Sequence, residues 1–392
     1  MRVDRRARAV ANVLVLSSDS GAKDANPYYW HRMQRLMRPV VEAAERQPAL
    51  RRLAARLSAD PGSRACWAEV CTTTASLLLE QPAGVEGLCE GAWALISRSR
   101  LDYHVGELAD GEAETADFAA LAELPPVPQL PPRLPAGPQD PRILVVVPFR
   151  DRTEDGARAR NLAACLRSLA DQSVPREQYL VTVVESDDRP RWRDLVAFHG
   201  GQHLFAENAG PFNKSWAVNV GAVNTTARAP LICVLDADSL VDRDFLRRND
   251  ARFQRPGTGA FLPYRDMLYL DDRATGRAIH ERCIVRRPVA ARELLRGFAV
   301  HRPPGGCVWL RRDVFESVGG MDERYEGWGR EDMDFVLRLQ LATALEGFDD
   351  PMLHLHHPSS AALVGGQTLN AHIPWLSWSP QGPIGELDRY ER

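Results

Sequence analysis

Hydrophobic residues follow a helical rhythm in the first part of the chain. Apolar positions recur every three or four residues over 33–41 and again over 50–57, with Pro48 between the two stretches. This spacing is typical of amphipathic helices that bury one face in a core. We therefore predict a mainly α-helical N-terminal domain over residues 1–113, in which no set of catalytic side chains stands out.

From residue 142 onward, short apolar runs alternate with helical stretches. The run over 143–147 is rich in β-branched residues, which is typical of a strand covered on both faces. Further runs predict strands over 180–184, 202–205 and 231–235, and the stretches between them predict helices over 162–169, 192–198 and 215–223. This alternation indicates an α/β fold with a mostly parallel sheet, in which ligands bind beyond the carboxyl ends of the strands.

A proline-rich segment separates the two parts. Eight prolines lie between residues 125 and 141, so this segment can form neither a helix nor a central strand. Such composition is typical of a semi-rigid, polyproline-like connector. We expect a linker over 114–141, an α/β domain over 142–360 and a C-terminal extension over 361–392.

Composition limits the kinds of binding partner and the cellular compartment that we expect for this protein. The formal net charge is -3 and the basic residues are scattered, so neither a nucleic acid nor an anionic membrane is indicated as a partner. The seven cysteines include no C-x-x-C pair, which argues against a zinc site and a disulfide framework. The apolar stretch over 9–16 is broken by Asn12 and is too short to span a bilayer. We expect a reduced, cytoplasmic protein with no integral membrane segment and no signal peptide.

Two carboxylates follow the strand predicted over 231–235. Asp236 and Asp238 lie one residue apart, directly after this apolar run. Burying both charges at a strand end is costly unless a cation lies between them, and Mg²⁺ or Mn²⁺ accepts carboxylate oxygens and shares phosphate oxygens with a substrate. An Asp-x-Asp triplet also occurs in ordinary turns and helix caps, so the triplet alone leaves that alternative open.

Basic residues occur at two other strand ends. Arg150 and Arg152 follow Pro148 after the first strand, and two forked donors suit the phosphates or the base of a nucleotide. An exposed basic loop is the alternative. Lys214 begins the helix over 215–223, and a helix N-terminus is a favourable place for a pyrophosphate.

Three downstream segments carry further candidates. Gly305 and Gly306 precede a strand-like run and allow backbone to approach a sugar closely. Trp328 can stack on a sugar face, and Glu331 or Asp332 can take a proton from a hydroxyl, although acids at a helix start also complement the helix dipole. The strand-like segment over 352–357 contains three histidines that could complete a metal site or be structural: His354, His356 and His357.

The ordered motifs resemble those of a known enzyme family. Pro-Phe-Arg-x-Arg, Phe-Asn-Lys…Asn-Val-Gly, Asp-Ala-Asp, Gly-Gly-Cys-Val and Gly-Trp-Gly-Arg-Glu-Asp are similar, in this order, to motifs of the β-1,4-galactosyltransferases and their bacterial relatives. Those enzymes share the Rossmann-like GT-A fold with family 2 transferases, polypeptide GalNAc-transferases and chondroitin-polymerase-like enzymes. The resemblance covers residues 142–358 and does not reach 1–113.

This resemblance implies roles for single residues. It implies a nucleotide-binding set that comprises Pro148, Arg150, Arg152, Glu185, Lys214 and Asp236. Within this set, Glu185 would face the base, Lys214 the diphosphate and Asp236 the ribose. Metal ligands would be Asp238 and His357, with His357 preferred to His354 because it matches the second histidine of the family's His-x-x-His segment.

The resemblance also implies the reaction. Asp332 would be the catalytic base, and the sugars would be bound by Glu331, Trp328, Gly305 and Gly306. We expect a glycosyltransferase dependent on Mn²⁺ or Mg²⁺ that moves a sugar from a nucleotide-sugar, with a UDP-sugar favoured (UDP-Gal, UDP-GalNAc or UDP-GlcNAc), to a hydroxyl of a saccharide or small-molecule acceptor. Attack from the opposite face would invert the anomeric centre. Arg330 and Met333 depart from the family pattern beside the sugars, which leaves sugar identity open.

Two alternatives remain at this stage. One is a retaining, GalNAc-transferase-like enzyme, in which the acid after Gly-Trp-Gly is not a base. The other is a catalytically silent glycan- or nucleotide-binding subunit of a biosynthetic assembly. The helical N-terminal domain has no assigned role, and a homodimer through this domain is one expectation.

Overall fold

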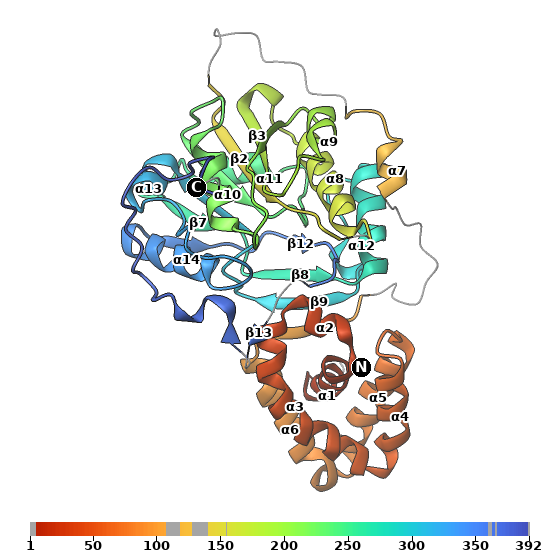
Figure 1. Ribbon diagram of the computed structural model, residues 1–392. Helices are drawn as coiled ribbons and strands as arrows, with labels where there is room; N and C mark the ends of the chain where they lie inside the picture. The colour runs from red at the N-terminus through yellow and green to blue at the C-terminus, as the bar shows by residue number, and fades with distance from the viewer. Residues whose placement is uncertain are drawn as a thin grey trace. The chain divides into compact units, whose positions relative to one another are not determined.

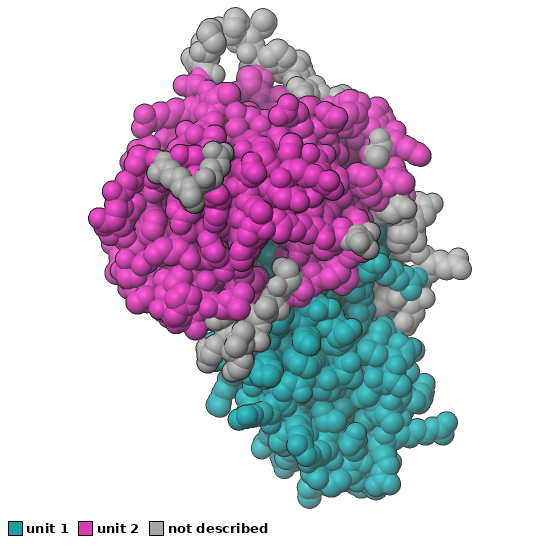
Figure 2. Space-filling model, in the orientation of Figure 1, with its two compact units in different colours: residues 1–114, 266–277, 291–302 teal, residues 115–265, 278–290, 303–392 magenta. Residues whose placement is uncertain are grey.

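The computed structural model describes residues 5–106, 118–127, 140–153, 155–359, 363–364 and 367–390. Most of the proline-rich linker expected over 114–141 lies outside the described residues. The chain forms two compact units, shown in different colours in Figure 2: unit 1 comprises 1–114, 266–277 and 291–302, and unit 2 comprises 115–265, 278–290 and 303–392. No helix within the described ranges is both long and apolar enough to cross a membrane.

Six helices build most of unit 1, which confirms the predicted helical character of the N-terminal region (Figure 1). They are α1 (Arg5–Ser18), α2 (Ser20–Ala25), α3 (Pro27–Arg46), α4 (Pro48–Ala59), α5 (Arg64–Glu80) and α6 (Pro82–Arg98). Helix α1 is buried over its whole apolar stretch and contacts α3, α4, α5 and α6. The stretch over 9–16 is therefore the central core helix of this unit. Asn12 is accommodated there because its side chain donates to Asp102 Oδ1 and accepts from Trp67 Nε1.

Three antiparallel strands complete unit 1. Strand β9 (Gly297–His301) pairs with β1 (Leu101–His104) and with β8 (Asp266–Leu270). Phe298 and Val300 of β9 belong to the same core cluster as the helices. Two short segments distant in sequence, 266–277 and 291–302, are thus part of the unit that begins at the N-terminus.

Unit 2 contains a seven-stranded sheet in the order β11-β7-β10-β5-β2-β3-β4. Its strands are β2 (Ile143–Phe149), β3 (Tyr179–Glu185), β4 (Gln202–Phe205), β5 (Leu231–Leu235), β7 (Ala260–Leu262), β10 (Cys307–Arg311) and β11 (Leu345–Gly347). Within this sheet β10 alone runs antiparallel to its neighbours, so the predicted α/β fold with a mostly parallel sheet is confirmed.

Helices lie on both sides of this sheet. They are α7 (Phe118–Ala122), α8 (Ala157–Ala170), α9 (Arg193–Phe198), α10 (Lys214–Val223), α11 (Phe245–Arg252), α13 (Arg312–Ser317) and α14 (Glu331–Ala342). Helix α12 (Asp272–Ile279) is divided between the two units, because unit 1 includes 266–277 and unit 2 includes 278–290. In Figure 1, α10, α13 and α14 lie to the left of strands β2 and β3, and α8 and α9 lie to the right. Gly221 lets α10 approach the sheet closely, because a Cβ there would lie 2.4 Å from Val146 and 2.9 Å from Val184.

Two short strands of a second sheet carry part of the polar site. Strand β6 (Ser239–Leu240) pairs with β12 (Met352–His354), and the Leu355 amide donates to the Asp238 carbonyl at 2.7 Å. The strand predicted over 352–357 ends at His354. A hairpin follows, formed by β13 (Leu363–Val364) and β14 (Gln367–Thr368).

The last part of the chain packs against unit 2. Trp216 of α10 donates its indole N–H to the Glu386 carbonyl, and Arg389 forms an ion pair with Glu323. The Trp378 indole donates to the Gly319 carbonyl at 2.7 Å. The described residues of 369–390 therefore belong to the packed structure of this unit.

Candidate active site

The antiparallel strand β10 brings two glycines to the Asp-x-Asp triplet. Because β10 runs against β5, its amino end lies at the carboxyl end of β5, where Cys307 is paired with Leu235. The Asp236 amide donates to the Gly306 carbonyl at 2.9 Å. Gly305 and Gly306 thereby line one small hollow together with Asp236, Lys214 and Asp332.

Lys214 connects two carboxylates across this hollow. Its Nζ lies 2.7 Å from Asp236 Oδ1 and 3.0 Å from Asp332 Oδ1, and it also reaches the second oxygen of each group, at 3.0 and 3.1 Å. Asn213 caps the start of α10 by accepting from the Trp216 amide, which fixes the position from which Lys214 extends.

Burial and neighbouring charge set the protonation of this group. Burial lowers the pKa of Lys214, but the charges of Asp236, Asp332 and Glu331 outweigh that effect and raise it well above its ordinary value. Burial raises the pKa of Asp236 to about 6, although Lys214 opposes the rise. Lys214 is therefore charged at neutral pH and is shared by two acids.

Asp238 faces away from this ion pair toward two histidines. Its Oδ2 lies 3.0 Å from His357 Nε2, and its Oδ1 lies 3.4 Å from His354 Nε2. Burial raises the pKa of Asp238, but the two imidazoles outweigh burial and hold it well below its usual range. Burial lowers the pKa of His354 to about 4, so its ring is neutral at pH 7.

This trio could hold a metal ion. One ligand atom from each of Asp238, His354 and His357 lies within 4.8 Å of the others, and the described residues contain no other such group of three. Asp238 Oδ1 is buried and accepts no hydrogen bond from a described residue. One carboxylate oxygen and two imidazole nitrogens suit Mn²⁺ better than Mg²⁺, which prefers oxygen ligands throughout.

The histidine segment is held in place by its backbone. Asn161 and Arg160 of α8 donate to the His356 carbonyl at 3.0 and 2.9 Å. The Nδ1 atom of His357 lies 2.9 Å from the Pro358 carbonyl, and a proton on that nitrogen would leave Nε2, which faces Asp238, as a ligand atom. The motifs did not identify Asn161 or Arg160, because nothing in their local sequence marks them as neighbours of residue 356.

Helix α14 begins with the two candidate acids, Glu331 and Asp332. Glu331 is buried, its Oε2 has no hydrogen-bond partner among the described residues, and burial together with Asp332 raises its pKa to about 8. It is therefore largely neutral at pH 7 and can donate a hydrogen bond. Trp328 is half-buried in the loop that leads into this helix.

The loop before α14 is supported by the C-terminal segment. Arg330 adopts a left-handed conformation with φ 83°, and its guanidinium donates to the Ala371 carbonyl at 2.7 Å and lies over the Trp375 ring. The Asn370 side chain donates to the Gly329 carbonyl at 3.0 Å. Residues 361–392 were expected only as a C-terminal extension, and Asn370 and Trp375 were not among the predicted site residues. No sequence motif marks either residue.

The remaining nucleotide-binding candidates form a separate group at the ends of β2 and β3. Both arginines donate to backbone carbonyls, Arg150 to Asn208 and Gly210 and Arg152 to Asn208. Glu185 is buried, accepts from the Arg191 and Trp192 amides, and lies 2.7 Å from His203 Nε2, while Pro148 is buried in β2. In the described structure these side chains organise the loops after β3 and β4.

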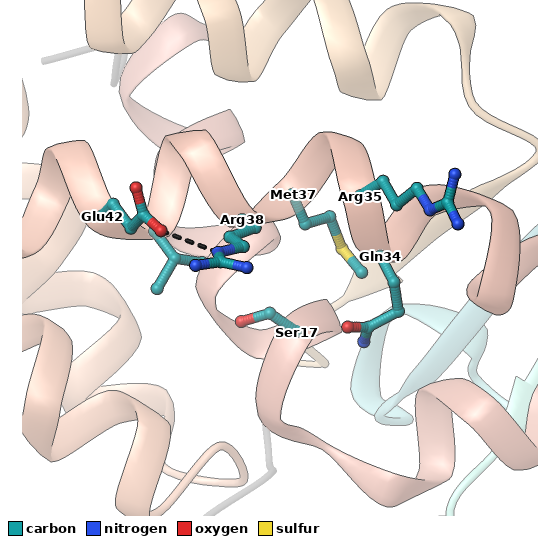
Figure 3. A pocket seen from close by; sticks show the side chains of 7 residues that line it. Ser17, Gln34, Arg35, Met37, Arg38 and Glu42 are labelled. Carbon is teal, nitrogen blue, oxygen red and sulfur yellow. Dashed lines mark hydrogen bonds and ion pairs between the residues drawn. The ribbon is translucent and has the colours of Figure 1, made fainter.

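Unit 1 has a hollow of its own, which Figure 3 shows from close by. It has a volume of about 430 Å³ and is lined by Ser17, Gln34, Arg35, Met37, Arg38, Val41 and Glu42. Arg38 and Glu42 pair with each other at 2.8 Å on the surface of α3. None of its lining residues belongs to the group of three that could hold a metal, and the candidate catalytic and metal-ligating residues all lie in unit 2.

Comparison with known families agrees with this placement. Residues 144–319 match glycosyl transferase family 2, and residues 289–352 match the family described as the N-terminal domain of galactosyltransferase. The protein contains a GT-A glycosyltransferase domain. The two matches overlap over 289–319 and together include Lys214, Asp236, Asp238, Gly305 and Asp332 of the candidate site. Both histidines of the candidate metal site lie just beyond them.

A curated protein and several solved structures are similar to the glycosyltransferase domain. The O-antigen biosynthesis protein RfbC of Myxococcus xanthus is 26% identical over 272 residues, which cover 62% of this chain and 19% of that protein. The chain thus spans about a fifth of the length of this relative.

The solved structures are more distant. TarS of S. aureus in complex with UDP-GlcNAc is 14% identical with a TM-score of 0.40, covering 57% of this chain and 62% of that one. A Drosophila β1,4-galactosyltransferase 7 complex with manganese, UDP-Gal and xylobiose is 20% identical with a TM-score of 0.33, covering 55% and 71%. A mannosyltransferase of Pyrobaculum calidifontis in complex with GDP-Man and Mn²⁺ is 17% identical with a TM-score of 0.37, covering 61% of each chain.

Proposed function

We propose that this protein transfers a sugar, with inversion, from a metal-bound nucleotide-sugar to an acceptor hydroxyl. The observation that carries the proposal is the continuous arrangement of Asp332, Lys214 and Asp236, followed by Asp238 and its two histidines. Asp332, an acid suited to accept a proton, thus lies at one end of this row of charged side chains. The site suited to hold a cation lies at the other end. A silent binding subunit would not need both ends.

Asp238, His354 and His357 would hold the metal ion. The pair of imidazoles favours Mn²⁺ over Mg²⁺, and His354 joins His357 as a ligand because both rings face the same carboxylate. When bound, the ion would offset the negative charge on the leaving nucleotide diphosphate.

The protein's own residues would carry the proton and orient the sugars. Asp332 would accept the proton of the acceptor hydroxyl as the oxygen attacks the anomeric carbon. Lys214 would face the diphosphate from the side of Asp236, as a point charge. Glu331, protonated near neutral pH, would donate a hydrogen bond from its unpartnered carboxyl to a sugar hydroxyl.

The nucleotide would be bound by the ends of β2, β3 and β5. Asp236 would lie near the ribose, while Arg150 and Arg152 would shape the nucleotide pocket through the loop carbonyls that they hold, in addition to any direct contact. Likeness to the galactosyltransferases favours uridine, and two similar structures are complexes with UDP-GlcNAc and UDP-Gal. The O-antigen relative favours a saccharide acceptor. A cytoplasmic location and a homodimer through unit 1 are further proposals.

Transfer assays with two variants test this function. We expect transfer from a UDP-sugar with Mn²⁺ present and none with EDTA. Asp332→Asn should lower kcat by about 10²–10⁴-fold, the usual contribution of a general base, while calorimetry still detects binding of UDP and Mn²⁺. Asp238→Asn should lose that binding. Near-normal transfer by Asp332→Asn would refute the base assignment, and a product with retained anomeric configuration by NMR would refute inversion.

A further inference from the structure

The side chain of Asp332 occupies space that only a glycine at position 305 leaves open. A Cβ added to Gly305 would lie 1.9 Å from Asp332 Oδ2, 2.6 Å from its Cγ and 3.2 Å from its Cβ. These three atoms are its nearest neighbours, and all of them belong to Asp332. No other residue comes closer to the missing side chain, so Asp332 is the group that excludes a larger residue here.

The backbone of Gly305 does not itself require glycine. Gly306, the next residue, has φ 109°, a conformation that other residues rarely adopt, whereas Gly305 is not among the positive-φ glycines. An alanine would therefore be tolerated at 305 by the backbone and opposed only by the carboxylate. The nearby Asp332 side chain, and not the backbone conformation, therefore explains the glycine at position 305.

Gly305 is itself held by a buried tyrosine. The Tyr264 hydroxyl donates to the Gly305 carbonyl, and Tyr264 is 1% exposed just after β7. On the other side of the carboxylate, Lys214 contacts both of its oxygens at 3.0 and 3.1 Å. Asp332 thus lies between an ammonium group and the Cα of a residue whose peptide is anchored to the core.

We propose that Gly305 and Tyr264 are positioning residues that fix the carboxylate of Asp332 for proton transfer. This role rests on the proposed function and differs from the sugar contact expected for Gly305 from the sequence. Tyr264 holds the Gly305 peptide in place, and Gly305 leaves room for the carboxylate beside Lys214. A displacement of the carboxylate by about 1 Å would misalign it with the acceptor hydroxyl, and such displacements cost about 10²-fold in rate.

A double-mutant cycle in thermal stability tests the packing. Gly305→Ala should lower Tm by at least about 3 °C in the wild-type background, because the new methyl meets the Asp332 carboxylate. In the Asp332→Ala background the two closest contacts are gone, so most of this loss should vanish. Gly382→Ala, a matched control whose Cβ would meet nothing within 4 Å, should leave Tm unchanged in both backgrounds. Equal losses in both backgrounds would overturn the proposed packing.

Kinetics test the positioning role. Gly305→Ala should lower kcat by about 10²-fold with an unchanged KM for the donor, and Tyr264→Phe, which removes one hydroxyl, should lower kcat in the same manner by a smaller factor. Gly382→Ala should retain the wild-type kcat. A normal kcat in Gly305→Ala, or a loss confined to the donor KM, would overturn the role. The Tm cycle does not depend on catalysis. A failure of Asp332 as the base would show as a near-normal kcat in Asp332→Asn, whereas a failure of the positioning role alone would show as a normal kcat in Gly305→Ala with a reduced kcat in Asp332→Asn.

Discussion

At the scale of single residues, carboxyl groups outnumber cations in the site. Asp236, Asp332 and Glu331 surround one ammonium group, that of Lys214, and Asp238 lies two residues from Asp236. Burial and neighbouring negative charge raise the pKa of a carboxyl group, so the acid whose charged form is least stabilised becomes neutral. That acid is Glu331, whose pKa is raised to about 8. The stability of the folded protein should therefore depend on the proton of Glu331.

Glu331→Gln should change how stability varies with pH. The folded-state pKa of Glu331 is about 8 and its ordinary value is 4.5, so the folded protein holds this proton more tightly than the unfolded chain. The stability linked to this proton is present below pH 4.5 and is lost as pH rises through 8. Glutamine imitates the neutral acid at every pH, so the variant should gain on the wild type by up to about 1.4 kcal/mol per pH unit in this window.

Urea unfolding at pH 5, 6.5 and 8 measures this difference. Glu316→Gln, which changes an exposed acid paired with Arg228, should follow the wild type at each pH. Parallel curves for Glu331→Gln and the wild type would show that Glu331 is ionised in the folded protein.

Residue types and spacing predicted part of the site but not its contacts. The motifs singled out Lys214, Asp236 and Asp332, and the structure brings them together, because each follows a strand end or starts a helix at the same edge. The motifs could not indicate that Arg150 donates to backbone carbonyls of the loops after β3 and β4. Nor could they indicate that Gly305 makes room for an acid, since that depends on two elements distant in sequence.

At the scale of elements, the start of α10 determines where Lys214 lies. Asn213 accepts from the Trp216 amide, and its own amide donates to the Glu323 carbonyl and to the Tyr390 hydroxyl. One buried side chain therefore joins the helix cap to the segment before α14 and to the C-terminal residues. Loss of this side chain should loosen three elements at once.

Asn213→Ala should destabilise unit 2 more than an ordinary cap mutation would. Loss of a cap costs about 1 kcal/mol and an unsatisfied buried carbonyl about 1–3 kcal/mol, so we expect about 2–4 kcal/mol in total by denaturant unfolding. Ser63→Ala is the matched control, because Ser63 caps α5 at a partly exposed position by accepting from Cys66. It should cost about 1 kcal/mol. Equal losses in the two variants would mean that Asn213 acts only as a cap.

Element positions were more predictable than their connections. The strands predicted over 202–205 and 231–235 coincide with β4 and β5. Pro230 and Asp236 bound the uninterrupted apolar run of β5, and Gly201 precedes β4. The antiparallel direction of β10 was not predicted, since a strand pattern carries no information on orientation. The packing of the described part of 361–392 against α10 also depends on contacts between distant residues.

At the scale of the whole molecule, unit 1 is assembled from separate parts of the chain. Sequence patterns are read over consecutive residues, so the hydrophobic periodicity and the proline-rich segment predicted one domain over 1–113 and another over 142–360, and these boundaries remain a prediction. In the structure, segments 266–277 and 291–302 join unit 1 through β8 and β9. The stability of the helical unit should therefore depend on side chains from these later segments.

Arg296 is the side chain through which this dependence is best measured. It is buried in unit 1, donates to the Tyr103 hydroxyl at 3.0 Å, and forms ion pairs with Asp19 and Asp271. Arg296→Ala would leave the two carboxylates without their shared cation, and such a loss typically costs about 3–5 kcal/mol. Arg56→Ala is the matched control in the same unit, since its exposed pair with Glu69 should contribute less than about 1 kcal/mol. Denaturant unfolding, followed by the circular dichroism of the helices, gives the free energy of unfolding of each variant. We expect the two values to differ by several kcal/mol, because most of the helices of unit 1 depend on a residue nearly 300 positions from the N-terminus. Similar stabilities for both variants would instead mean that residues 1–106 hold together without the later segments.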